Sequence, residues 1–177
     1  MRVSDRNHLW ALLRLIAFAA ALLIAPGASN AQPPHDLATG TGTLGTFGNP
    51  TMHVNASILP NGRTNGSFSI TYPDGTFASG RIVCLFVQGN TAFLIGQTTS
   101  VGGPADHLAA LNWAVGNFID LGVQDNGEPG TGPVPDRMNF SPGHLTEPTC
   151  GVLSDADPDQ DNNLFIVKGN FQVVDAP

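Results

Sequence analysis

Residues 51–97 read TMHVNASILPNGRTNGSFSITYPDGTFASGRIVCLFVQGNTAFLIGQ, and this stretch decides the fold. Apolar and polar side chains alternate over 52–58 and again over 68–72, which is the pattern of half-buried strands. The run 76–87 is apolar on both faces and is therefore expected at the centre of a sheet. Pro, Asn, Asp and Gly between the runs predict three tight turns. Four strands joined in this way form an antiparallel meander.

The sequence on either side of the meander continues the pattern. Strands are expected at 41–47, at 112–124 with a bulge, at 136–141 and at 164–174, and residues 106–111 predict one or two helical turns. About eight short strands predict an all-β fold, either a single antiparallel β-barrel or a β-sandwich, and the pattern does not choose between them. A parallel α/β fold is excluded because its crossover helices are missing.

The N-terminus has the features of a cleaved secretory signal peptide over residues 1–31. Three arginines accompany a ten-residue apolar run at 15–24, and small residues precede the expected cleavage site. A retained membrane anchor is the alternative, but a spanning helix needs about 20 apolar residues. We therefore expect a secreted, extracellular chain without a membrane span. It would have an unstructured segment at 32–40 and a single β-domain at 41–177.

The charge balance excludes two classes of partner. The net charge is −7, and three of the seven Lys and Arg residues lie in the expected signal peptide. The remainder lacks the clustered cations with which proteins bind nucleic acids and anionic membranes. An extracellular protein or glycan is the kind of partner that this composition leaves open.

The two cysteines of an exported chain most simply form one disulfide, between Cys84 and Cys150. Closing a loop of about 67 residues would stabilise the fold by about 4 kcal/mol. The alternative is a metal-binding or catalytic thiol. That alternative lacks both a CxxC spacing and a second set of soft ligands.

Three short segments occur in a characteristic order. They are VQGNTA at 87–92, VQDNGEPG at 123–130 with Asp136 downstream, and GNFQV at 169–173. Over most of residues 41–175 the chain resembles the uncharacterised secreted bacterial β-domain family sometimes labelled post-COAP. The resemblance implies an exported β-fold and no assigned activity. This chain departs from the family pattern in an insertion at 101–111 and in the acidic loop near residue 155.

Two groups of acidic residues are rich in oxygen ligands, and the first is a candidate calcium site. The first is Asp155, Asp157, Asp159 and Asp161, whose carboxylates stand at alternate positions and are the hard oxygen ligands that Ca²⁺ prefers. This loop lacks the glycine and the glutamate of an EF-hand, and a solvated acidic loop is the alternative. The second group is Asp125, Asn126, Glu128 and Asp136, for which the alternative is an inert turn whose acids face water. The sequence predicts no cofactor, unless the acidic loop binds calcium.

No catalytic residue is predicted. The histidines at 35, 53, 107 and 144 are accompanied by neither a Gly-x-Ser-x-Gly elbow nor a metal-site spacing. We therefore expect a non-enzymatic secreted β-module with a structural, adhesive or cell-surface interaction role.

The candidate ligand-facing residues are Tyr72, Phe77 and Trp113. Their alternative role is packing in the core. Aromatic faces in a groove or barrel mouth bind sugars and apolar ligands, so the second interpretation is a small-ligand or carbohydrate-binding barrel. A secreted hydrolase is the third. A cavity lined by Tyr72 or Trp113 would favour the binder, and a filled interior would favour the module. A cleft with clustered His and carboxylates would favour the hydrolase.

Overall fold

The computed structural model describes residues 35–127, 134–151, 156–159 and 164–176. The expected signal peptide lies outside these ranges. The elements in chain order are β1 (Leu37–Leu44), β2 (Thr51–Ile58), β3 (Thr64–Thr71), β4 (Phe77–Gln88), β5 (Thr91–Gly102), α2 (Ala105–Ala110), β6 (Phe118–Gln124), β7 (Arg137–Phe140) and β8 (Ile166–Val174). Within the described ranges, no helix has the length and apolarity that a membrane crossing requires.

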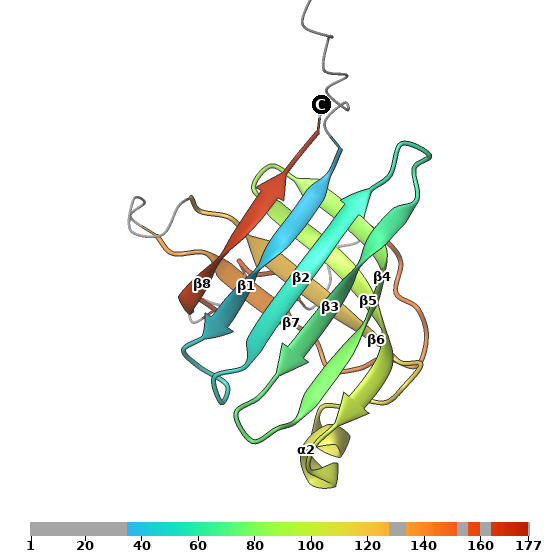
Figure 1. Cartoon of the computed structure of the whole chain (residues 1–177), viewed down its shortest axis with the longest axis vertical. Helices are drawn as coiled ribbons and strands as arrows, with labels where there is room; N and C mark the ends of the chain where they lie inside the picture. The colour runs from blue at the N-terminus through green and yellow to red at the C-terminus, as the bar shows by residue number, and fades with distance from the viewer. Residues whose placement is uncertain (1–34, 128–133, 152–155, 160–163, 177) are drawn as a thin grey trace, which may run out of the picture. The chain divides into compact units, whose positions relative to one another are not determined.

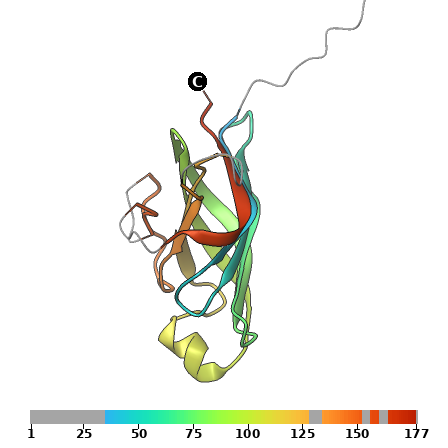
Figure 2. The same cartoon turned by 90° about the vertical axis from the view of Figure 1, so that its left-hand side faces the viewer.

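The eight strands form one antiparallel sheet that curls into a nearly closed barrel. Their order is β7-β6-β5-β4-β3-β2-β1-β8, so β4 is central, as its two apolar faces predict. The ends of the sheet meet at two backbone hydrogen bonds. The N–H of Met138 donates to the carbonyl of Leu164 at 3.1 Å, and the N–H of Ile166 donates to the carbonyl of Asp136 at 3.0 Å. In Figure 1 the layer containing β8, β1, β2 and β3 crosses the layer containing β5, β6 and β7, and Figure 2 shows the two layers edge-on. The barrel, rather than the sandwich, is therefore the fold.

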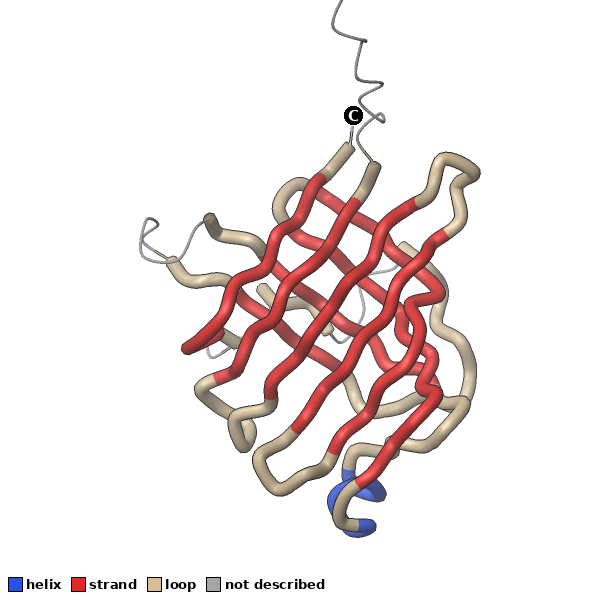
Figure 3. The backbone as a smooth tube through the Cα atoms, in the orientation of Figure 1, coloured by secondary structure: helices blue, strands red, loops and turns tan. Residues whose placement is uncertain are grey.

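Irregular pairing between β4 and β5 accompanies the curvature of the sheet. The register shifts between Ser79 and Gly80 and again between Ile82 and Cys84. An extra residue in one strand bends it and increases its twist, which is how long strands turn a barrel corner. Figure 3 shows these long strands passing from one layer to the other at the side of the barrel.

Apolar side chains fill the inside of the barrel. The inward positions of β2 are Met52, Val54 and Ala56, each no more than 1% exposed, as the alternation predicts. Strand β6 adds Ile119 and Leu121, both fully buried. The described strands therefore enclose a packed core.

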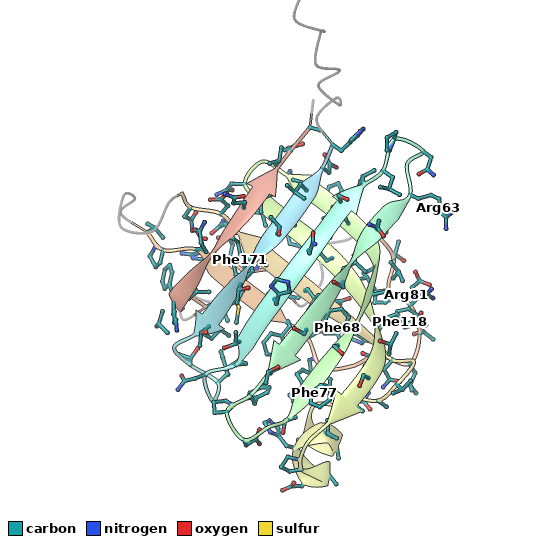
Figure 4. All side chains as sticks on the ribbon, viewed as in Figure 1. Arg63, Phe68, Phe77, Arg81, Phe118 and Phe171 are labelled. Carbon is teal, nitrogen blue, oxygen red and sulfur yellow. A yellow bond between two sulfur atoms is a disulfide. The ribbon has the colours of Figure 1, made fainter. Side chains whose placement is uncertain are left out.

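Two aromatic rings in this core, those of Phe68 and Phe171 (labelled in Figure 4), lie directly against glycines of other strands. A Cβ atom at Gly42 of β1 would lie 2.6 Å from the ring of Phe171, and one at Gly96 of β5 would lie 2.4 Å from the ring of Phe68. Carbon atoms cannot approach so closely, so only glycine leaves room for these rings. The glycine-rich character of β1 is thus a packing requirement.

The structure corrects two expectations about the boundaries of the strands. Residues 37–40 belong to β1, so the prediction of an unstructured segment at 32–40 is wrong for its second half. Residues 112–117 are not a strand, and β6 begins at Phe118. The helical turns predicted at 106–111 are present as α2.

The disulfide pairing is confirmed. Cys84 of β4 and Cys150 are bonded, with Cα atoms 5.8 Å apart. The bond ties the loop that follows β7 to the central strand of the sheet.

Candidate functional site

The β1–β2 loop, the β3–β4 turn and α2 lie together at one end of the barrel (Figure 1). The β3–β4 turn is closed by hydrogen bonds from the N–H of Tyr72 to the carbonyl of Thr76 (2.8 Å) and from the N–H of Gly75 to the carbonyl of Tyr72 (3.0 Å). The side chain of Asp74 accepts the N–H of Thr76 at 2.8 Å. The Pro-Asp-Gly signal in the sequence therefore positions Tyr72 at this end of the barrel.

Phe47 is an exposed aromatic residue in the β1–β2 loop. Its side chain is 61% exposed and its φ is +54°, a left-handed conformation that residues other than glycine rarely adopt. The backbone of the adjacent Gly48 lies against Tyr72, since a Cβ at Gly48 would be 3.5 Å from that ring. Strained backbone of this kind concentrates at functional sites.

Two open depressions share Phe47 and Tyr72, and together we call them the Phe47 groove. One has a volume of about 290 Å³ and is mainly apolar. The other has a volume of about 450 Å³ and has a polar side. The first is lined by Leu44, Phe47, Tyr72, Leu111, Asn139, Phe140 and Pro142, and the second by Phe47, Gly48, Tyr72, Pro73, Asp74 and His107.

Tyr72, which lines the groove, belongs to an aromatic cluster. The ring of Tyr72 lies 5.9 Å from that of Trp113 and 6.4 Å from that of Phe140, and the last two are 6.0 Å apart. Trp113 is only 3% exposed and lines neither depression, so its predicted ligand-facing role is wrong. Phe77 also lines neither, and its ring packs over Gly102. Of the three predicted residues, Tyr72 alone reaches the groove.

His107 gives the groove a polar side. Its Nδ1 atom lies 2.8 Å from Oδ2 of Asp74 and 2.9 Å from Oγ1 of Thr76, which fastens α2 to the β3–β4 turn. The N–H of Thr76, followed by His107, lowers the pKa of Asp74, so this carboxylate is ionised at neutral pH. Burial, followed by the charge of Asp74, raises the pKa of Tyr72, which keeps its hydroxyl protonated.

Two acids of the second oxygen-rich group, Asp125 and Asp136, accept backbone hydrogen bonds. Asp136, only 4% exposed, accepts the N–H of Asn126 at 2.8 Å and that of Phe171 at 2.7 Å. Asp125 accepts the N–H of Gly127 at 2.8 Å and that of Val173 at 3.2 Å. The acids therefore join the turn after β6 to β8, and the expectation that they face water is wrong for Asp136. Glu128 lies outside the described residues.

The acidic loop is described only at Asp157 and Asp159, since Asp155 and Asp161 lie outside the described ranges. The carboxylate of Asp159 pairs with the guanidinium of Arg137 at 2.7 Å, and Asp157 accepts the N–H of Asp159 at 2.9 Å. Among the described residues there is no group of three or more His, Cys, Asp or Glu that could hold a metal. Calcium binding by the whole loop stays a prediction from the sequence.

A further group of polar side chains lies beside β6 and consists of Ser141, His144 and Asp120. The sequence spacing did not indicate this grouping. Nε2 of His144 lies 3.1 Å from Oγ of Ser141 and 3.5 Å from Oδ2 of Asp120. A hydrolase triad uses both ring nitrogens, one for serine and one for the acid, whereas here one nitrogen makes both contacts. Oγ of Ser141 also accepts the N–H of Asp120 and donates to the carbonyl of Pro142, and Ser141 is 2% exposed. This geometry holds a loop in place and does not present a nucleophile.

The sequence pattern missed Phe47, Asp74 and His107 as members of one site. The sequence pattern places Phe47 at the end of the strand expected at 41–47, whereas β1 ends at Leu44 and Phe47 lies in the loop before β2. Asp74 and His107 are 33 residues apart, and nothing local indicates their contact. Comparison with known proteins finds no family model, curated protein or solved structure that matches this chain, so its function has to be argued from the Phe47 groove itself.

Proposed function

We propose that this protein is an exported, non-catalytic β-barrel module that binds a neutral glycan in the Phe47 groove. The observation that carries the proposal is an exposed aromatic ring, held on a left-handed backbone, at the boundary of two depressions. The packed interior of the described strands favours a surface site over a chamber inside the barrel. Export is supported by the disulfide, which persists in oxidising compartments, and by the signal-like leader.

The chemistry of the groove favours a sugar. Sugar rings present an apolar C–H face, which stacks on aromatic side chains, and hydroxyl groups, which need hydrogen-bonding partners. Phe47 and Tyr72 supply the aromatic surface, and Asp74, His107 and Asn139 supply polar groups at its sides. The larger depression lies within the range of about 300–1,000 Å³ that is usual for small-molecule sites.

The charge of the chain favours a neutral glycan over an acidic one. The net charge is −7, and the carboxylate of Asp74 lies in the groove itself. An acidic polysaccharide would be repelled at this site. A neutral sugar incurs no such penalty.

Trp113 is a built-in reporter for the test. Residues 34–177 form a compact unit that contains every described strand, so residues 32–177 can be produced as a separate chain. Trp113 is then the single tryptophan, because the other, Trp10, is removed. Titration with neutral gluco-, xylo-, manno- and chito-oligosaccharides should change its emission through the adjacent Tyr72, and calorimetry should give the same affinity.

The decisive variant is Phe47→Ala, which removes an exposed ring and should leave folding intact. We expect binding to weaken by about tenfold, the loss of roughly 1.4 kcal/mol that truncation of an aromatic contact produces. Leu145→Ala is the matched control, because Leu145 is 82% exposed and lines neither depression. The proposal is wrong if no neutral oligosaccharide binds, or if both variants bind like the unmodified chain.

A further inference from the structure

A third depression lies on another part of the barrel, between the start of β3 and the middle of β4. Its volume is about 510 Å³. The pairing of β3 with β4 ends at Ser67 and Arg81, although β3 extends back to Thr64 and β4 continues to Gln88. The two strands part beyond this pair, and the depression opens between them. It is lined by residues 62–66 on one side and by residues 81–83 on the other.

Arg63 and Arg81 both line this depression (Figure 4). The described residues contain only two other strong cations, Arg137 and Lys168, in a chain with a net charge of −7. Two of these four cations therefore lie in one depression.

Neither arginine has an acidic partner among the described residues. The ion pairs found there involve His107 with Asp74, Arg137 with Asp159 and His144 with Asp120. Arg81 donates from Nε to the neutral side chain of Gln97 at 3.0 Å, and a second bond from Nη2 reaches the same oxygen. These contacts orient the guanidinium without neutralising it, so its other N–H donors are available to a ligand.

We propose that the depression between β3 and β4 binds an oxyanion, a phosphate, sulfate or carboxylate group on a small ligand. Guanidinium groups bind such anions through paired, charge-assisted hydrogen bonds, and two of them around one depression match a group with charge near −2. Thr64 and Asn65 also line the site, and their side chains carry a hydroxyl and an amide donor. This site is separate from the Phe47 groove and takes an anionic ligand rather than a neutral one.

The test compares inorganic phosphate, sulfate and citrate with sodium chloride at equal ionic strength. The readouts are calorimetry and the thermal unfolding midpoint of residues 32–177. We expect at least one of the three oxyanions to bind and to raise the midpoint, while chloride does neither. Which of them binds most tightly distinguishes a phosphate or sulfate ligand from a carboxylate ligand. Equal effects of all salts, including chloride, would overturn the proposal, because they would reflect ionic strength alone.

Arg63→Gln and Arg81→Gln should each weaken oxyanion binding by about tenfold, the usual effect of losing a charge-assisted hydrogen bond. Lys168→Gln is the matched control, since it changes the net charge equally but lies outside the depression. Arg63→Lys retains the charge and should retain part of the affinity. If Lys168→Gln reduces binding as much as the arginine variants do, the attraction is a property of net charge and the site does not exist.

Discussion

Asp136 allows a quantitative test of how the barrel is held together. Its carboxylate accepts the N–H of Asn126 through Oδ1 at 2.8 Å and the N–H of Phe171 through Oδ2 at 2.7 Å. An asparagine has one acceptor oxygen, so in Asp136→Asn one of these two donors would face an amide N–H₂. Losing a hydrogen bond to a charged group and leaving a buried donor unsatisfied costs about 2–3 kcal/mol.

Part of this destabilisation is offset, because asparagine carries no charge that has to be buried. Burial is the largest influence on the pKa of Asp136 and raises it, with the charge of Asp125 adding to the effect, whereas the two N–H donors lower it. The pKa of Asp136 is raised overall, so its carboxyl group ionises less readily in the folded protein than in the unfolded chain. At neutral pH we therefore expect Asp136→Asn to destabilise the protein by about 1–2 kcal/mol, and Asp136→Ala by about 3 kcal/mol because both donors lose their acceptor.

The contribution of Asp136 to stability changes with pH in a defined direction. A raised pKa means that the folded state binds the proton more tightly, so stability from this group is complete below its ordinary pKa of about 4 and is lost as the pH rises through the folded value. The asparagine side chain does not ionise, so Asp136→Asn lacks this dependence on pH. The difference in the free energy of unfolding between the unmodified chain and this variant should therefore decrease as the pH rises.

The measurement is urea unfolding followed by the emission of Trp113 at several pH values. Asp106→Asn is the control, since it removes a carboxylate from an exposed position of α2. An Asp136→Asn variant as stable as the unmodified chain at every pH would refute the double-acceptor role. A stability difference that grows with pH would refute the direction of the pKa.

Four further experiments test the fold and the other acidic residues. Replacing Cys84 and Cys150 by serine should lower the free energy of unfolding by about 4 kcal/mol, and an unchanged urea midpoint would contradict the covalent restraint. Phe68→Ala, at a residue 2% exposed, should cost about 3–5 kcal/mol in the same assay. Because the pKa of Asp74 is lowered, its stabilising contribution should be lost as the pH falls through the folded value, and Asp74→Asn should lack this component of the acid-unfolding curve. Millimolar calcium tests the acidic loop 155–161: binding there should raise the thermal midpoint, and an unchanged midpoint would rule out the calcium site predicted from the sequence.

Much of the secondary structure could be predicted because its signals are local. The alternation in β2 follows from the opposite directions of successive side chains in a strand, and the Pro-Asp-Gly turn before β4 follows from backbone preferences. The errors lie where local signals compete. Residues 112–117 contain strand-forming side chains, yet Asn112 has a φ of +52° and Gly116 a φ of +93°, and these conformations interrupt a strand.

The candidate site was predicted less well than the fold. Tyr72 and Trp113 are both aromatic and both follow polar or turn residues, and nothing in their local sequence separates the one that lines a groove from the one that is buried in the core. The same holds for Asp136, whose role depends on β8, 35 residues away along the chain. A carboxylate is a plausible metal ligand from the sequence and a backbone acceptor once its neighbours are known.

The sequence by itself determined an antiparallel all-β chain with one disulfide and a charge unsuited to polyanions, because periodicity, turn chemistry, cysteine number and charge are properties of neighbouring residues or of composition. Only the tertiary structure decided that the sheet closes into a barrel, that Phe47 and Tyr72 share a groove with His107, and that Arg63 and Arg81 line one depression. Each of these depends on strand register and on bulges accumulated across the whole sheet, so that residues distant in the chain become neighbours.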